Sequence, residues 1–265
     1  MDKLPPSHRF FDFSDYSRPF SKLLVKVVIN SRLTPIFFTT ISLLCGIFSA
    51  VLIYLDKLTL LTAMLILLKS FFDAVDGELA RARNRPSYVG RFYDSVADFF
   101  VNVIIFLSLS LRFNESFIKL FAVIILFHLQ GSVYNYYYVL KRHKAGGDKT
   151  SKIDERKIEQ IFPYDNPFWF KFFHTLYIWI YSWQDWIIYK IDTSVERLSN
   201  IPNSFMTIVS LLGLGTQLFL IAFFVLFGFE KFIIDFFVYV YSFIAFMIIL
   251  IRKIFYRVGQ GFMYE

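Results

Sequence analysis

The residues of this sequence best suited to chemistry are four aspartates in the stretch DAVDGELARARNRPSYVGRFYDSVAD, residues 73–98. The first two, Asp73 and Asp76, are spaced i, i+3. The second two, Asp94 and Asp98, are spaced i, i+4, so each pair lies on one face of a helix. If the two helices are antiparallel neighbours, all four carboxylates converge, and they repel one another unless cations neutralise them. Oxygen ligands alone indicate a hard divalent ion, Mg²⁺ foremost, with Mn²⁺ or Ca²⁺ as alternatives.

Small residues and an arginine lie between the aspartates. Gly77, Ala80 and Gly90 allow helix backbones to approach closely or admit a ligand. Arg81 supplies a bidentate group suited to phosphate. Carboxylates, a divalent metal and an arginine together indicate phosphoryl transfer, in which a metal pair bridges a diphosphate while an oxygen nucleophile attacks.

The elements that must position these residues lie in a membrane. Hydrophobic residues make up 56% of the 265 positions and aromatic residues 21%, which is too much apolar surface for a water-soluble protein of this size. A helix needs roughly 20 residues to cross about 30 Å of hydrocarbon. We therefore expect an all-α bundle of six transmembrane helices. The expected spans are 36–55, 58–72, 99–111 extended upstream through Asp94, 117–140, 205–227 and 232–251.

Outside the spans, residues 19–30 place apolar side chains at helical spacing opposite Lys22 and Lys26, which predicts an amphipathic helix in the membrane interface. A soluble cap helix is the alternative. We divide the chain into an N-terminal segment, 1–33, and a transmembrane catalytic domain, 34–265. The domain carries a cytoplasmic or interfacial insertion, 141–200, whose aromatic part, 166–191, we interpret as an interfacial helix or hairpin rather than a seventh span.

The basic residues predict the orientation. With the N-terminus in the cytoplasm, most lysines and arginines fall inside, and only Lys57, Arg112, Lys119 and Lys231 fall outside. Both termini and the acidic stretch are then cytoplasmic. The net charge of +7 is accounted for by this topology and by attraction to anionic headgroups, and no nucleic-acid motif is visible. The single cysteine, Cys45, excludes a disulfide framework.

The spacing Asp73-x2-Asp76-Gly77-x2-Ala80-Arg81-x8-Gly90-x3-Asp94-x3-Asp98 resembles, with no gap or substitution, the signature of the CDP-alcohol phosphotransferases, also called CDP-alcohol phosphatidyltransferases. The resemblance implies six transmembrane helices, an N-terminal interfacial helix and, commonly, a homodimer. It also implies cleavage of a CDP-alcohol to CMP, with the phosphoalcohol passing to a hydroxyl. We expect an integral protein of a bacterial inner membrane with CDP-alcohol and lipid substrates.

The resemblance also implies roles for individual residues. Two Mg²⁺ or Mn²⁺ ions would be held by Asp73, Asp76 and Asp94, with Asp98 completing the site and acting as the general base. The residues expected to frame the cytidine and diphosphate are Asp73, Gly77, Ala80, Arg81 and Gly90. One departure stands at Ile36, which follows Thr34-Pro35 where many members have asparagine.

The acceptor site is open to more than one interpretation. The candidates are Lys69, Gln130, Asn135, Arg197 and Arg252. The two arginines serve equally well as topology signals, and the two amides could instead hydrogen-bond neighbouring helices. For Lys69, one turn before Asp73, an ion pair with that aspartate is favoured over acceptor binding.

The reaction that we expect is transfer of a phosphatidyl group from CDP-diacylglycerol to a small acceptor alcohol. The alternative is a CDP-choline or CDP-ethanolamine donor with diacylglycerol as acceptor. A more distant alternative is a six-helix transporter with an acidic ion site. Transport sites lie near the bilayer midplane, whereas these acids cluster at one edge, which favours the enzyme.

Overall fold

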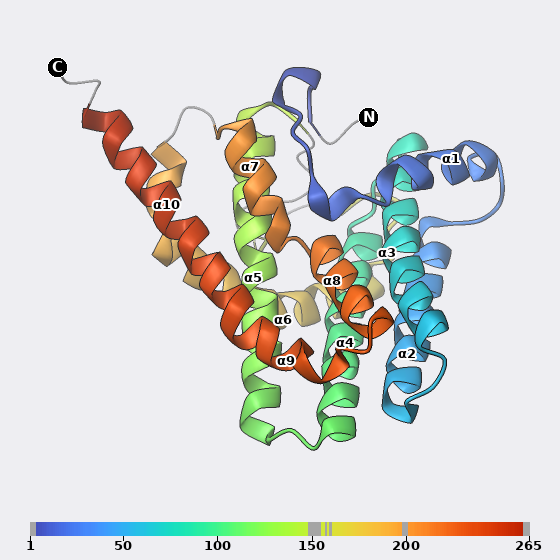
Figure 1. Cartoon of the computed structure of the whole chain (residues 1–265). Coiled ribbons are helices and arrows are strands. Elements are labelled where there is room, and N and C mark those ends of the chain that lie inside the picture. The colour runs from blue at the N-terminus through green and yellow to red at the C-terminus, as the bar shows by residue number, and fades with distance from the viewer. Residues whose placement is uncertain (1–3, 148–154, 157, 159–160, 198–200, 262–265) are drawn as a thin grey trace.

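The computed structural model describes residues 4–147, 155–156, 158, 161–197 and 201–261, with the backbone alone for 197 and 255–261. Within these ranges the protein is all-helical, and no strand is present. Its long helices form a bundle, and the short α1 lies across one end (Figure 1). The principal helices are α1 (Arg18–Val28), α2 (Pro35–Leu55), α3 (Thr59–Ala82), α4 (Tyr88–Phe113), α5 (Phe117–Lys144), α6 (Pro167–Ile191), α7 (Asn203–Val209), α8 (Leu214–Leu226) and α10 (Ser242–Gly261).

Four stretches of the described chain are long and apolar enough to cross a membrane, namely α2, α4, α5 and the run 230–254. A fifth results if α7, with the short turn η4 (Ser210–Leu212), and α8 form one span bent by 47°. The protein is therefore an integral membrane protein. The expected second span, 58–72, corresponds to the first part of α3. This helix is not among the candidate spans because Lys69, Asp73 and Asp76 place three charges among its first 18 residues. The helix also runs ten residues beyond the expected end at 72.

Four of the long helices, α2, α4, α5 and α6, begin at side-chain caps. Thr34 Oγ1 accepts a hydrogen bond from the Phe37 amide at 3.2 Å, with Pro35 in the first turn of α2. Ser87 Oγ accepts from the Gly90 amide at 2.9 Å and begins α4. The Ser87 cap fixes where α4 begins after the loop 83–87, and α3 ends at Ala82 before that loop.

A close approach of α2 to α4 depends on one glycine. A Cβ built on Gly46 would lie 2.3 Å from Cγ1 of Val101, closer than real Cβ atoms approach their neighbours. The helix α2 packs against both α3 and α4, whereas α3 and α4 make few backbone contacts with each other. Side chains of α3 and α4 nevertheless meet, because Asp73 lies beside Asp94 and Asp98 and Lys69 pairs with Asp98.

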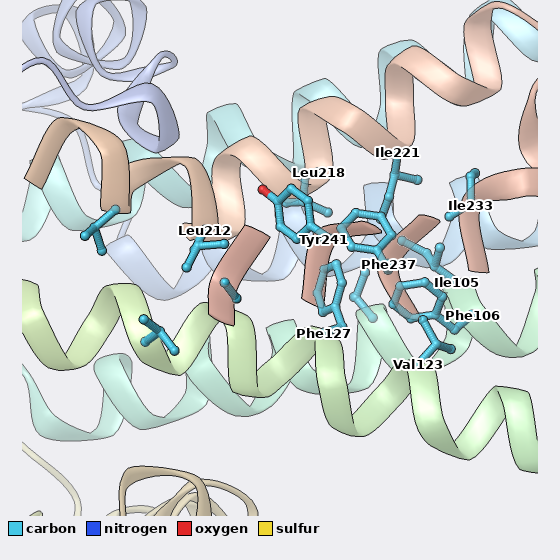
Figure 2. Close-up of a cluster of buried hydrophobic side chains, with 14 of the residues drawn as sticks. Ile105, Phe106, Val123, Phe127, Leu212, Leu218, Ile221, Ile233, Phe237 and Tyr241 are labelled. Carbon is cyan, nitrogen blue, oxygen red and sulfur yellow. The ribbon is translucent and has the colours of Figure 1, made fainter. Parts of the chain in front are cut away.

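The main core lies among α4, α5, α8 and the C-terminal run, where Figure 2 shows Phe106, Phe127 and Phe237 meeting. The ring centroids of Phe127 and Phe237 are 5.1 Å apart. Phe237 belongs to η6 (Phe236–Tyr241), a π-helical stretch that follows α9 (Ile233–Asp235). Gln130 Nε2 donates to the Phe237 carbonyl at 2.9 Å and to Ser242 Oγ at 3.0 Å, so this buried amide satisfies backbone that the irregular turn leaves free.

Charge pairs join segments at the end of the bundle away from α1. Arg112, at the end of α4, pairs with Asp56 beyond α2, and its Nη1 lies 3.8 Å from Glu230 Oε1. Lys119, in the first turn of α5, lies 2.8 Å from Asp235 and 3.0 Å from Glu115. Two of the four basic residues expected on the outer side are thus matched by carboxylates.

Candidate active site

A cavity of about 850 Å³ lies between α3, α4 and α5. Its walls also include residues 14–17, part of the segment 155–169, and α8. The cavity is lined by every residue of the acidic signature: Asp73, Asp76, Gly77, Ala80, Arg81, Gly90, Asp94 and Asp98. The sequence spacing therefore corresponds to a shared surface in three dimensions.

Three of the aspartates meet. One carboxylate oxygen from each of Asp73, Asp94 and Asp98 lies within 4.8 Å of the others. Asp73 Oδ1 is buried and has no hydrogen-bond partner among the described residues. Asp76 lies one turn further along α3 and accepts a hydrogen bond from Thr39 Oγ1 at 2.5 Å. Converging carboxylates with an unpaired buried oxygen fit a hard divalent cation, so the residues present are suited to the metal that the sequence predicts.

Lys69 compensates part of this negative charge. Its side chain is fully buried, and Nζ forms an ion pair with Asp98 across from α3 to α4. The pairing expected with Asp73 is absent from the ion pairs of the described residues, because the extended lysine chain reaches the carboxylate of the other helix. Lys69 does not line the cavity.

At the C-terminal end of α3, glycine makes room for an arginine. A Cβ built on Gly77 would lie 3.2 Å from both terminal nitrogens of Arg81. Arg81 Nη2 donates to Glu78 Oε1 at 2.9 Å, and Arg18 Nε donates to the same oxygen at 2.6 Å. Arg81 Nε is buried without a partner among the described residues. The guanidinium is thus oriented by Glu78 and retains a donor for a ligand.

The insertion contributes two acidic residues that the sequence analysis did not identify. Asp165 accepts hydrogen bonds from Ser87 Oγ at 2.5 Å and from the Tyr88 amide at 2.8 Å, which caps the start of α4. Glu155 accepts two hydrogen bonds from Arg91, at 2.6 and 2.7 Å. Both acids lie on the cavity wall. The insertion therefore holds the first turns of the helix that carries Asp94 and Asp98.

Of the acceptor candidates whose side chains the structure describes, only Asn135 lines the cavity. Gln130 is outside the lining and bonds to the C-terminal run. Arg252 is buried away from the cavity, where it pairs with Asp192 and donates to Ser194 Oγ at 2.6 Å. Arg197 belongs to η3 (Thr193–Arg197), and its side chain is outside the described part of the chain.

The comparisons with known proteins agree with this geometry. The family model for CDP-alcohol phosphatidyltransferase matches residues 32–191. The chain therefore belongs to the CDP-alcohol phosphatidyltransferase family and is an enzyme of that family, whose members use divalent metals. It is also similar to the bifunctional IPC transferase and DIPP synthase of Aquifex aeolicus (strain VF5), at 33% identity over 85 residues. That similarity covers 32% of this chain and 19% of the relative, so the chain matches about a fifth of the relative's length.

Proposed function

We propose that this enzyme transfers a phosphatidyl group from CDP-diacylglycerol to the hydroxyl of an acceptor alcohol and releases CMP. The observation that carries the proposal is the meeting of Asp73, Asp94 and Asp98 within 4.8 Å, in a cavity that the rest of the signature also lines. Diacylglycerol-bearing donors are favoured because compact members of the family more often use them. Transport is excluded as the main activity by the family membership.

The acceptor oxygen forms a bond to the phosphorus that carries diacylglycerol, and the bond from that phosphorus to the oxygen leaving with CMP breaks. Asp98 accepts the hydroxyl proton, which makes a weak nucleophile effective. Its ion pair with the buried Lys69 orients the carboxylate.

The donor is held by residues of α3 and α4. Asp73, Asp76, Asp94 and Asp98 would hold one or two Mg²⁺ or Mn²⁺ ions, which would supply charge neutralisation for the diphosphate. Arg81 would donate to a phosphate oxygen while Glu78 orients it. Gly77, Ala80 and Gly90 leave room for the nucleotide beside these groups.

The topology completes the proposal. Six spans result if α3 crosses the membrane with its charged end in the cavity and if α7 and α8 form one bent span. The exposed Phe20, Leu23 and Val27 of α1 support a helix lying in the membrane interface on the cytoplasmic side. Both termini and the cavity mouth would then face the cytoplasm, and the working form would be a homodimer.

A donor panel tests the proposal. The full chain, purified in detergent and supplied with Mg²⁺, is incubated with CDP-diacylglycerol, CDP-choline or CDP-ethanolamine and with matching acceptor alcohols, and CMP is measured. We expect CMP release with CDP-diacylglycerol and a small alcohol. Release only from CDP-choline or CDP-ethanolamine with diacylglycerol would replace the proposed donor and acceptor by the alternative pair.

A further inference from the structure

The short helix α1 is attached to the last turns of α3, across whose end it lies (Figure 1). At the start of α1, Arg18 Nε donates to Glu78 Oε1 at 2.6 Å. In the middle of α1, the buried Val25 packs in one cluster with Val75 and Leu79 of α3. Buried side chains interdigitate closely, so such a cluster holds two helices in a fixed relation. The first half of α1 is therefore tied to the end of α3.

The other end of α1 is held by one side chain, that of Arg83, the residue that ends α3. Its guanidinium donates to four backbone carbonyls: Nη2 to Val28 and to Ser31, both at 2.9 Å, Nε to Ile29 at 2.9 Å, and Nη1 to Leu33 at 2.6 Å. The last carbonyls of a helix have no partner within it, and a cation there is also favoured by the helix dipole. Arginine carries five N–H donors in one planar group, so a single side chain serves all four carbonyls. Arg83 thus fixes the end of α1 and the connection from α1 to α2.

The same turns of α3 present another face to the cavity. Gly77, Ala80 and Arg81 line the cavity, and they alternate along the helix with the residues that α1 contacts. Glu78 joins the two faces directly, because its Oε1 accepts from Arg81 Nη2 at 2.9 Å as well as from Arg18. A displacement of α1 would therefore move the groups that we assign to the donor.

The outer face of α1 is apolar and exposed. Phe20, Leu23 and Val27 expose 64%, 60% and 79% of their surface. Lys22 and Lys26 are exposed on the same helix. Large apolar side chains accompanied by lysines on one short helix fit a lipid surface that carries anionic headgroups. A membrane surface is therefore the partner that the chemistry of this face matches.

We propose that α1 is a membrane-seated support for the donor site and that Arg83 is a positioning residue for the donor. The inference rests on the proposed function. With α1 on the lipid surface, its attachments hold the end of α3, and Glu78 then presents Arg81 to the donor diphosphate. Loss of the lipid contact and loss of the Arg83 hydrogen bonds would displace the same groups. The two losses should therefore not add, because both act through α1.

Donor and acceptor KM values of the full-length protein, in vesicles of phosphatidylcholine and phosphatidylserine, test the proposal. Arg83→Gln should raise the KM for CDP-diacylglycerol by about tenfold, the effect of losing a hydrogen bond to a charged group. The acceptor KM should not change. Arg83→Lys should raise the donor KM by less, because its ammonium keeps a cation at the end of α1. Arg32→Gln, which replaces an exposed arginine in the same connection, should leave both KM values unchanged.

A second variant removes the lipid contact and leaves the attachments of α1 to α3 in place. The combined replacement Phe20→Ser, Leu23→Ser, Val27→Ser should also raise the donor KM, and the addition of Arg83→Gln should raise it little further. The matched control is Phe117→Ser with Ile118→Ser, two side chains that are 78% and 80% exposed at the other end of the bundle. This control should leave the donor KM unchanged. If Arg83→Gln fails to fold, the surface variant and Arg83→Lys still decide the question.

Four outcomes would overturn the inference. An unchanged donor KM in Arg83→Gln or in the surface variant would do so while the proposed function stands. Effects that multiply in the combined variant would show that Arg83 and the lipid contact act separately. An equal rise in donor and acceptor KM would show a general loss of structure instead of positioning. Absence of CMP release from the wild type with every donor would overturn the proposed function and this inference with it.

Discussion

Replacement of Asp98 by asparagine separates the structural and chemical roles of the Lys69–Asp98 ion pair. The variant keeps the side-chain shape but leaves the buried Lys69 without its counter-charge. Breaking a buried ion pair by removing one partner costs about 3–5 kcal/mol. At about 2–4 °C per kcal/mol for a chain of this size, the melting temperature should fall by about 6–20 °C. Loss of the general base should also lower CMP release by at least about 100-fold.

The double variant Lys69→Met, Asp98→Asn distinguishes the two effects. It removes both charges, so it should recover most of the lost melting temperature. It should not recover CMP release, because the proton acceptor is still absent. Melting temperature, donor affinity and CMP release are measured for both variants and the wild type in the same detergent.

Donor binding provides a second comparison. Asp98→Asn keeps one ligand oxygen and should retain donor affinity, whereas Asp73→Asn and Asp76→Asn should weaken donor binding as well as turnover, since each removes charge from the metal site. Near wild-type turnover in Asp98→Asn, or recovery of turnover in the double variant, would refute the role given to Asp98.

Three further predictions concern the metal, the topology and the packing. Excess EDTA should abolish CMP release and added Mg²⁺ or Mn²⁺ should restore it; turnover undiminished by the chelator would contradict the metal site. A cysteine introduced at Ser87, with Cys45 replaced, should react with an impermeant thiol reagent only after the cytoplasmic side is opened, and labelling of intact cells would reverse the orientation. Gly46→Ala should destabilise the protein by about 1–3 kcal/mol because its Cβ would meet Val101 at 2.3 Å. The steric cost should exceed the gain in helix propensity that alanine brings over glycine. The melting temperature should recover when Val101→Ala is added, and an unchanged value in the single variant would show that the helices adjust freely.

Local sequence features predicted much of the fold. Uninterrupted apolar runs predicted α2 and the C-terminal run, and polar boundaries placed α5 within a few residues. The arrangement of α2, α3 and α4 was not predictable in the same way, because the close contact at Gly46 is set by a residue 55 positions away, Val101. The length of α3 was also underestimated, because hydropathy predicts the end of the span at residue 72, where the aspartates begin, whereas the helix continues to Ala82.

The sequence likewise predicted the part of the candidate site that follows a local pattern and missed the part that depends on distant contacts. The aspartates, the glycines and Arg81 follow a short fixed spacing, so the sequence alone indicated them. Glu155 and Asp165 bind residues 64 and 77 positions away, and no local pattern marks them. Arg252 was one of the acceptor candidates, and its carboxylate partner, Asp192, is visible only in the fold.

The charge pairs at the end of the bundle away from α1 have a consequence for biogenesis. Arg112 and Lys119 are synthesised more than 100 residues before Glu230 and Asp235, the acids that approach them. During synthesis these two cations have only the nearer acids Asp56 and Glu115 as partners. Arrival of the last hydrophobic run supplies the remaining carboxylates, so this end of the bundle is completed only when the C-terminal segment inserts. A nascent chain stopped before residue 230 would hold its α4–α5 hairpin less firmly than the finished protein does.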